Sequence, residues 1–469
     1  MALTHQKFQG DYILKKLFTV LVFLALLTSS LFADLTFSGL TGAGATFLRM
    51  SNVNGDPMQA GNYLTGQIQV DAQSKDKTFG GTAKLTGETS TFKIDAATWN
   101  ALTWTASVWW NPIPMLKFQF GIINDLALSD CVYSDFYPDD AETYVVAPYS
   151  SYVGDYFPSW TGFFGGTGDT WSGFILSLTP TEALNINLML PYGLGVETVD
   201  SSGNITHFPA ASDIYLYGQA QATFMIWDIG RIGAAFSGGG NGKLDFTPDP
   251  DDAPYDPALP IGFYQMKANA SSFYGSFLFN AFEDQGLDIN VGFKYTMPVE
   301  DKAKKITYNS PMEAGLGISY VTDSFGIKMR MAASFGGNVK RTGNDPMNIP
   351  KMAGLGIMPF ISAGRCKIYL NAGITYKYED EYMDGSDGNK VKKVTNSAAL
   401  GWHVNPYVTA TFGTATVYAG FQIDTDGLKY VYDGNTMSRL TINQVDSTGK
   451  YPGTSIIEWR IPVGIEYTF

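Results

Sequence analysis

The feature that most constrains the fold of this chain is a side-chain period of two, which is clearest at its C-terminal end. From Ile457 to Phe469 every odd position is apolar, whereas the even positions include Glu458, Arg460 and Glu466. A β-strand places successive side chains on opposite faces, while a helix of this composition would mix the two sets. The segment is therefore predicted to be a strand with one apolar and one polar face.

The same alternation recurs along the chain, for example over 287–297, 325–334, 367–377 and 416–424. It predicts eighteen strands, at 35–48, 61–73, 78–88, 101–111, 114–123, 171–179, 184–191, 215–227, 230–238, 268–281, 286–297, 310–321, 325–337, 351–362, 366–378, 401–412, 415–425 and 456–469. The alternation is broken within 74–100, so a pair of strands could be gained or lost there. Sixteen strands is the alternative.

The length of the alternating runs separates two all-β folds. A soluble sandwich also alternates, but its strands average about five or six residues. Several runs here last 11 to 13 residues, near the about 9–11 that cross a membrane at a tilt, and their polar faces carry charges that suit a wet lumen. Tight turns also alternate with long polar connections, at 124–170, 192–214, 239–267, 298–309, 338–350, 379–400 and 426–455. We predict a single transmembrane, antiparallel, up-and-down β-barrel with short periplasmic turns and long extracellular loops.

The first 33 residues have the pattern of a cleaved secretory signal peptide. Lys15 and Lys16 precede an apolar run over 17–27, and small residues lead to Ala33. No later apolar stretch reaches the about 18 residues that a spanning helix needs. The expected domains are therefore a signal peptide, 1–33, and a barrel, 34–469.

Charge and cysteine content exclude other classes of protein. The chain has a formal charge of −13, which becomes −15 without residues 1–33. Such acidity argues against a nucleic-acid partner, which would favour basic stripes. The two cysteines, Cys131 and Cys366, are predicted at opposite ends of the barrel, too far apart for a disulfide.

The final alternation, with Ile465, Tyr467 and the C-terminal Phe469 at successive odd positions, resembles the recognition signature of outer-membrane proteins of Gram-negative bacteria and spirochaetes. The resemblance implies a bacterial outer-membrane barrel of the porin type, assembled by the barrel-assembly machinery and surrounded by outer-membrane lipid. In such porins the third extracellular loop often narrows the pore, and a homotrimer is common. Along the rest of the chain the resemblance is one of architecture, not of residues.

A barrel of 16–18 strands encloses a water-filled channel, so the residues that line it are the candidate functional residues. From Phe118 to Gly230 the chain has 13 acidic residues and no Lys or Arg. The long loop 124–170 is also rich in Tyr, Phe and Trp. Its candidate constriction residues are Asp130, Asp135, Asp139, Asp140 and Glu142; on the strands the lining candidates are Lys294, Lys328, Arg330, Lys367 and Arg460, with Lys377. Acidic loop and basic wall together would set a transverse field across the pore.

Each of these features also has a plainer interpretation. The acidic loop could be a solvated surface, and the wall cations could pair locally with acids such as Asp288. The loop aromatics could stack on sugar rings, form a small core of the loop, or lie at the lipid headgroups. The acidic groups at 245–256 and 384–387 could bind Ca²⁺, but solvated charge is the simpler interpretation.

Catalytic and cofactor signals are poor. Only His207 and His403 remain after residue 33, no G-x-S-x-G pattern is present, and no metal-ligand spacing is found. We predict a non-enzymatic porin without a cofactor, passing small hydrophilic solutes with a mild preference for cations. The alternatives are a surface adhesin or antigen with functional loops, an outer-membrane barrel enzyme, and a transporter of hydrophobic substrates.

Overall fold

The computed structural model describes residues 34–51, 61–91, 101–124, 170–191, 217–239, 244–247, 265–268, 270–282, 286–302, 305–341, 347–348, 351–384, 391–425, 429–433, 436–439, 453–455 and 457–469. The predicted signal peptide, 1–33, and nearly all of the loop 124–170 lie outside these residues.

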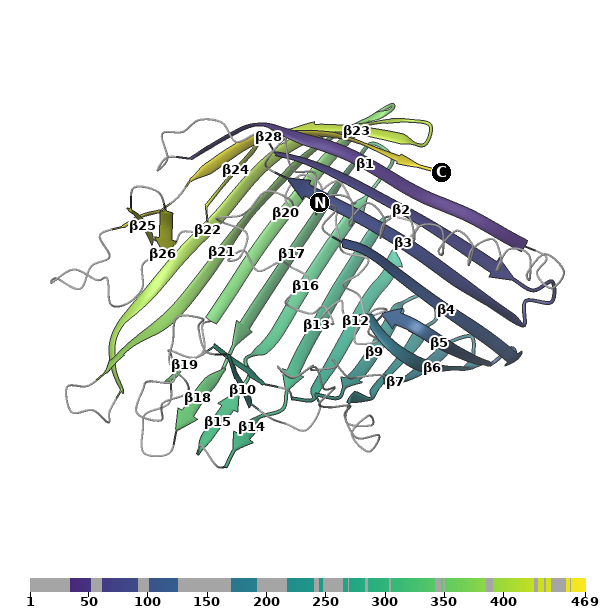
Figure 1. Cartoon of the computed structure of the whole chain (residues 1–469), viewed down its shortest axis with the longest axis horizontal. Helices are drawn as coiled ribbons and strands as arrows, with labels where there is room; N and C mark the ends of the chain where they lie inside the picture. Colours follow the sequence, from purple (N-terminus) through teal and green to yellow (C-terminus); the bar gives the residue numbers. More distant parts are fainter. Residues whose placement is uncertain are drawn as a thin grey trace, which may run out of the picture.

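The described chain forms one closed antiparallel barrel (Figure 1). Its strands are β1 (Asp34–Ser51), β2 (Gly61–Gln73), β3 (Phe79–Thr91), β4 (Ala101–Ile113), β5 (Leu116–Asn124), β6 (Thr170–Thr181), β7 (Leu184–Pro191), β8 (Gln219–Ile226), β9 (Gly230–Ser237), β12 (Ser272–Phe282), β13 (Leu287–Thr296), β16 (Met312–Val321), β17 (Phe325–Phe335), β20 (Lys351–Ala363), β21 (Cys366–Asp384), β22 (Val391–Phe412), β23 (Ala415–Gly420) with β24 (Gln422–Thr425), and β28 (Glu458–Thr468). Only Phe421 separates β23 from β24, and both pair with β22 and β28, so they form one wall strand. The predicted count of eighteen is confirmed, and the weak region 74–100 adds or removes none.

The barrel closes where its last strand pairs with its first. β28 runs antiparallel to β1 from Leu40↔Thr468 to Ser51↔Glu458. The seam continues to the last residue, because Phe469 donates its N–H to the Gly39 carbonyl at 2.9 Å and accepts from the Gly39 N–H at 2.8 Å. Every strand edge of the wall is thereby paired, as a strand in hydrocarbon requires.

Short turns connect the strands at one end of the barrel, here called the short-turn end. The turns after β20 and after β22 place a glycine at positive φ, Gly364 at 62° and Gly413 at 66°, a conformation that other residues adopt with strain. In the turn after β2, Asp76 accepts hydrogen bonds from the hydroxyls of Ser74 and Thr78 and from the Thr78 N–H. These bonds favour the carboxylate and hold the pKa of Asp76 below its ordinary value.

At the opposite end, four wall strands continue past a break as a small sheet. The sheet contains β14 (Val299–Asp301), β15 (Ile306–Asn309), β18 (Asn338–Arg341) and β19 (Met347–Asn348). Its register is that of the wall: Lys294↔Glu313 between β13 and β16 continues as Val299↔Tyr308 between β14 and β15. Val299, Ile306 and Val339 of this extension are buried, and partial burial of Tyr308 raises the pKa of its hydroxyl. Shorter pairs β10 (Leu244–Thr247) with β11 (Gln265–Ala268), and β25 (Lys429–Asp433) with β26 (Thr436–Arg439) and β27 (Thr454–Ser455), lie in the other long connections.

The hairpin of β21 and β22 differs from the sequence prediction. The predicted strands end at 378 and resume at 401, but β21 and β22 stay paired out to Asp384↔Val391. β20 pairs with β21 only as far as Lys351↔Tyr378, so the hairpin projects beyond its neighbour (Figure 1). Outside the membrane a strand needs no apolar face, which is why the alternation ends before the strand does.

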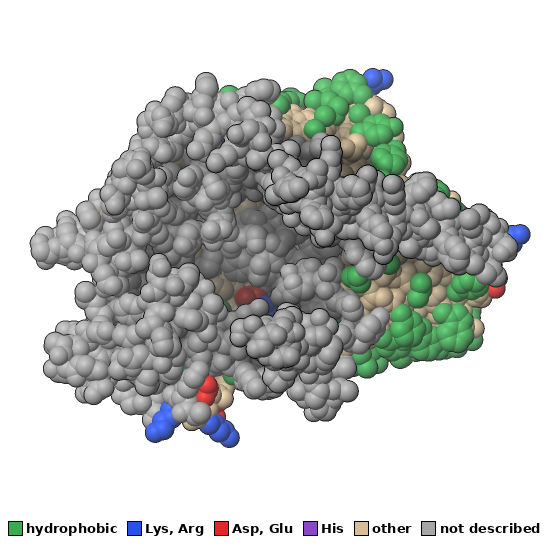
Figure 2. Space-filling model, viewed as in Figure 1, with side chains coloured by type: hydrophobic (Ala, Val, Ile, Leu, Met, Phe, Trp, Pro, Cys, Tyr) green, Lys and Arg blue, Asp and Glu red, His purple; other side chains and the backbone are tan. Residues whose placement is uncertain are grey.

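The two faces of the wall differ as the alternation predicts. On β28, Ile461, Ile465 and Tyr467 are exposed on the outer face, whereas Arg460 and Pro462, on either side of Ile461, are buried on the inner face. Apolar side chains gather on the outside over β4–β7 and around β1, β23 and β28 (Figure 2). An apolar outer band and a polar interior are the arrangement of a barrel that lipid surrounds.

Candidate functional site

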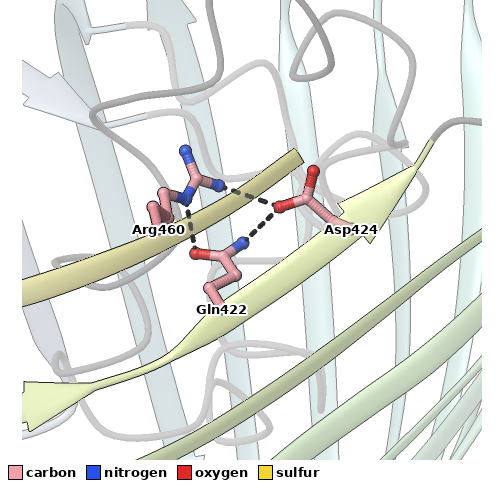
Figure 3. Close-up of polar contacts among 3 residues, drawn as sticks. All are labelled: Gln422, Asp424 and Arg460. Atoms are coloured by element: carbon pink, nitrogen blue, oxygen red, sulfur yellow. Dashed lines mark hydrogen bonds and ion pairs between the residues drawn. The ribbon is translucent and has the colours of Figure 1, made fainter. Parts of the chain in front are cut away.

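The inner wall is the candidate functional site, and it includes a polar cluster on β24 and β28. Gln422 lies opposite Arg460 in the ladder between these strands, and Asp424 is the next inward position (Figure 3). Arg460 donates from Nε to Gln422 Oε1 at 2.8 Å and from Nη2 to Asp424 Oδ2 at 3.2 Å. Gln422 Nε2 in turn donates to Asp424 Oδ2 at 2.9 Å. Each side chain therefore bonds to both others.

This cluster is almost fully enclosed. The side chains of Arg460 and Asp424 are 2% and 5% exposed. A buried guanidinium is tolerated only with a carboxylate partner and further hydrogen bonds, and both are present. Arg460 lies on the inner face, but its charge is neutralised within the wall and contributes little to the field in the lumen.

A second ion pair neutralises Lys294, on β13. Its Nζ lies 3.7 Å from Glu313 Oε2, on the neighbouring strand β16, and 5.7 Å from the centre of the Tyr274 ring on β12. Glu313 and Asp424, which pair with the two wall cations, were not among the residues predicted from sequence. Their strands were predicted, but partners across a ladder follow from the register, which one sequence does not specify.

Two of the remaining basic candidates, Lys328 and Lys367, lie nearer the short-turn end. Lys328 is half-buried on β17, next to Met358 in the ladder with β20. Lys367 is exposed on β21, with Nζ 5.6 Å from the centre of the Phe360 ring. Arg330 lies opposite Gly356 and Gly317 in its two ladders, and its side chain is outside the description, as is that of Lys377. Lys328 and Lys367 form no ion pair with any carboxylate of the described residues.

The acidic candidates Asp130, Asp135, Asp139, Asp140 and Glu142 all lie outside the described residues, as does Cys131. The proposed constriction and its transverse field thus remain predictions. Cys366 is a free thiol. Among the described residues no group of three or more His, Cys, Asp and Glu could hold a metal ion. The acidic groups at 245–256 and 384–387 are largely outside the description.

Tyr467 and Phe469, the expected assembly signal, lie on the outer face at the seam. Their rings are 6.1 Å apart and roughly parallel, and both are exposed. Gly39 of β1 lies under the Phe469 ring, so closely that a Cβ there would overlap it. Their geometry is that of outward-facing aromatic residues at the end of the closing strand.

Aromatic side chains were missed on the inner wall beside the polar cluster. Tyr369 on β21 and Tyr407 on β22 are opposite each other, and their rings stack at 4.5 Å with an angle of 7°. Phe360 and Met358 on β20 complete this buried group. His403 faces inward on β22, where its Nε2 lies 3.1 Å from Asn371 Oδ1. The signal that could have found them is their position: Tyr369, Asn371, His403 and Tyr407 all occupy the polar phase of the alternation.

Among the residues described, none belongs to a helix long and apolar enough to cross a membrane.

A closed antiparallel barrel of eighteen strands, apolar outside and polar and charged within, has the architecture of a porin-like transmembrane β-barrel. Its structure is similar to OpdL of Pseudomonas aeruginosa, at 11% identity and a TM-score of 0.47 over 93% of this chain and 99% of that one. It is also similar to an anion-selective porin from Comamonas acidovorans, at 10% identity and a TM-score of 0.43 over 93% and 99%. It is similar as well to OmpT of Vibrio cholerae in its trimer form, at 10% identity and a TM-score of 0.41 over 93% of this chain and 99% of that one. No family model matches the sequence, and no relative is found among curated proteins.

Proposed function

We propose that the protein is a passive diffusion channel for small hydrophilic solutes. The observation that carries this proposal is the closed wall of eighteen strands with polar and charged side chains on its inner face. A barrel of eight strands is filled by its own side chains, whereas one of sixteen to eighteen strands leaves an aqueous channel.

A mild preference for cations is the finer part of the proposal. It rests on the formal charge of −13, and on the pairing of Arg460 and Lys294, which removes two cations from the field in the lumen. Lys328 and Lys367 temper the preference, because neither has a carboxylate partner among the described residues.

Planar-bilayer recording tests both parts. We expect discrete openings and, in a salt gradient, a reversal potential of the sign that cation flow produces. Lys328→Gln combined with Lys367→Gln should increase the cation preference. As a matched control, Lys75→Gln with Lys77→Gln makes the same charge change in the exposed turn after β2. A folded barrel without conductance would contradict the channel itself, and an anion-selective reversal potential would contradict only the preference.

One observation favours a second function, that of a surface adhesin. The β21–β22 hairpin projects past the barrel wall with six paired positions beyond Tyr378 on β21, at Glu379 to Asp384. A projecting two-stranded ribbon presents unpaired backbone edges to a partner. Deleting residues 379–398 should leave conductance unchanged and abolish attachment of cells to a host surface, if the hairpin has this role.

A further inference from the structure

Two inward-facing amides in the described wall lack hydrogen bonds at both of their polar atoms, Asn405 on β22 and Gln221 on β8. Their residues are 0% and 1% exposed. A buried amide without partners is costly, and native structures contain few of them. An unsatisfied amide on the inner wall of a channel is therefore a position at which a polar group of a passing solute can bind.

The surroundings of Asn405 differ from those of Gln221. Asn405 lies opposite Asn371, and the ladder pair Val404↔Ile423 brings Gln422 to its other side. Both neighbours are engaged: Asn371 with His403, and Gln422 with Arg460 and Asp424. The wall on either side is thus fixed by its own hydrogen bonds, and the Asn405 amide lies between two ordered polar groups.

Charge and geometry restrict what could bind there. Asn405 lacks a partner for its Nδ2 donor and for its Oδ1 acceptor. An anion could bond only to the donor and a cation only to the acceptor, whereas a hydroxyl group both donates and accepts. Because Arg460 and Asp424 neutralise each other, the neighbourhood also has no net charge to attract an ion.

A buried aromatic pair adjoins the amide on the side of the short turns. Tyr407, two residues along β22 on the same face, stacks on Tyr369, and the two residues are only 3% and 4% exposed. Aromatic faces pack against the C–H faces of cyclic polyols. Once a neighbouring side chain moves aside, an amide next to a stacked ring pair matches a molecule that has hydroxyl groups at its edge and C–H groups on its face.

We propose that the wall around Asn405 is a binding station for a neutral, polyhydroxylated solute such as a sugar, held during its passage. The proposal rests on the channel function proposed above and names its substrate class. Asn405 is the buried residue at the centre of this site, and His403, which is half-exposed, and Tyr407 lie on either side of it. Because the Asn405 amide is fully buried, one of these two side chains moves aside when the solute binds. We expect this binding to appear as interruptions of the ionic current.

The test is single-channel recording with glucose, sucrose and the anion gluconate added to the parent protein and to Asn405→Leu. The neutral sugars should interrupt the current of the parent protein, and gluconate should do so less. Losing the hydrogen bonds of one amide should weaken the apparent sugar affinity about tenfold. Gln221→Leu is the matched control: it removes the other unsatisfied amide, from a different part of the wall, and should leave the interruptions unchanged.

A second readout separates binding from structure. Removing an unsatisfied amide with an apolar side chain should leave the barrel as resistant to urea as before, or more so. Weaker sugar binding without loss of stability would support the station. The binding site would be overturned if the sugars interrupted the current equally in the parent protein and in Asn405→Leu, or if Gln221→Leu weakened the sugar affinity as much as Asn405→Leu does. Either result would leave the proposed channel function intact. A folded barrel with no conductance would instead overturn the channel function.

Discussion

Removing the carboxylate of Asp424 should strongly destabilise the barrel. In the wall, Asp424 Oδ2 receives the Arg460 guanidinium at 3.2 Å and the Gln422 amide at 2.9 Å. Asp424→Ala deletes both bonds and leaves the Arg460 charge enclosed without this partner. Because the two side chains are only 2% and 5% exposed, water screens the loss little, and breaking such a pair costs about 3–5 kcal/mol.

The double variant Asp424→Ala with Arg460→Met gives the sharper test. It removes the buried charge together with its partner, and methionine keeps most of the side-chain volume. We expect the double variant to lose about 1–3 kcal/mol less free energy of unfolding than the sum of the losses in the two single variants, because residues in one hydrogen-bond network are usually coupled in this way.

Equilibrium unfolding in urea from phospholipid vesicles, followed by tryptophan fluorescence, measures these free energies. Asp323→Ala, in the exposed turn before β17, serves as control and should change stability by about 0.5 kcal/mol or less. A loss as small as this for Asp424→Ala, or strict additivity in the double variant, would refute the reasoning that the cluster acts as a buried unit.

Three further predictions follow from single positions. Gly464→Val should cost about 1–3 kcal/mol in the same urea assay, because its Cβ would overlap the Tyr418 hydroxyl on the neighbouring strand; an unchanged midpoint would contradict the packing. Phe469→Ala should lower the yield of barrel folded in the outer membrane, read as the heat-modifiable band on a gel, yet refold normally in vesicles if the residue acts through the assembly machinery. The carboxyl of Asp76 should titrate by NMR below the ordinary pKa of an aspartate. Because folding lowers this pKa, the carboxylate stabilises the barrel above its unfolded pKa, and this stabilisation is lost as the pH falls through its folded pKa. Asp76→Asn should abolish this part of the pH dependence of stability.

The wall strands could be predicted from sequence because the membrane imposes the alternation. Residues such as Ile461 and Ile465 contact lipid and must be apolar, so their spacing identifies the strand. Beyond the membrane that constraint ends. The outer part of β21, up to Asp384, and the short strands of the extension around Ile306 were accordingly predicted as loops, although backbone pairing continues there in the register of the wall.

The candidate site was less predictable than the fold. Arg460, Lys294, Lys328 and Lys367 lie on the inner face because the odd or even position of a residue in its strand decides the face, while their role in lining a pore stays a prediction. The alternation did not show which of them are neutralised, since Asp424 lies 36 residues from Arg460 in the chain and meets it only through the register of β24 and β28. Nor does the alternation indicate that the Asn405 amide has no partner, because that depends on the rotamers of its neighbours.

Several rings on the inner wall lie over glycines of an adjacent strand, Trp109 over Gly80, Phe360 over Gly326 and Tyr418 over Gly464. A ring that lies flat in this way occupies almost none of the cross-section available to a solute. Any side chain at the glycine would tilt the ring toward the barrel axis. The open width of the channel at that height therefore depends on the glycine of one strand as much as on the aromatic residue of the neighbouring strand. Channel width can therefore be adjusted by glycine substitutions at positions that no solute contacts.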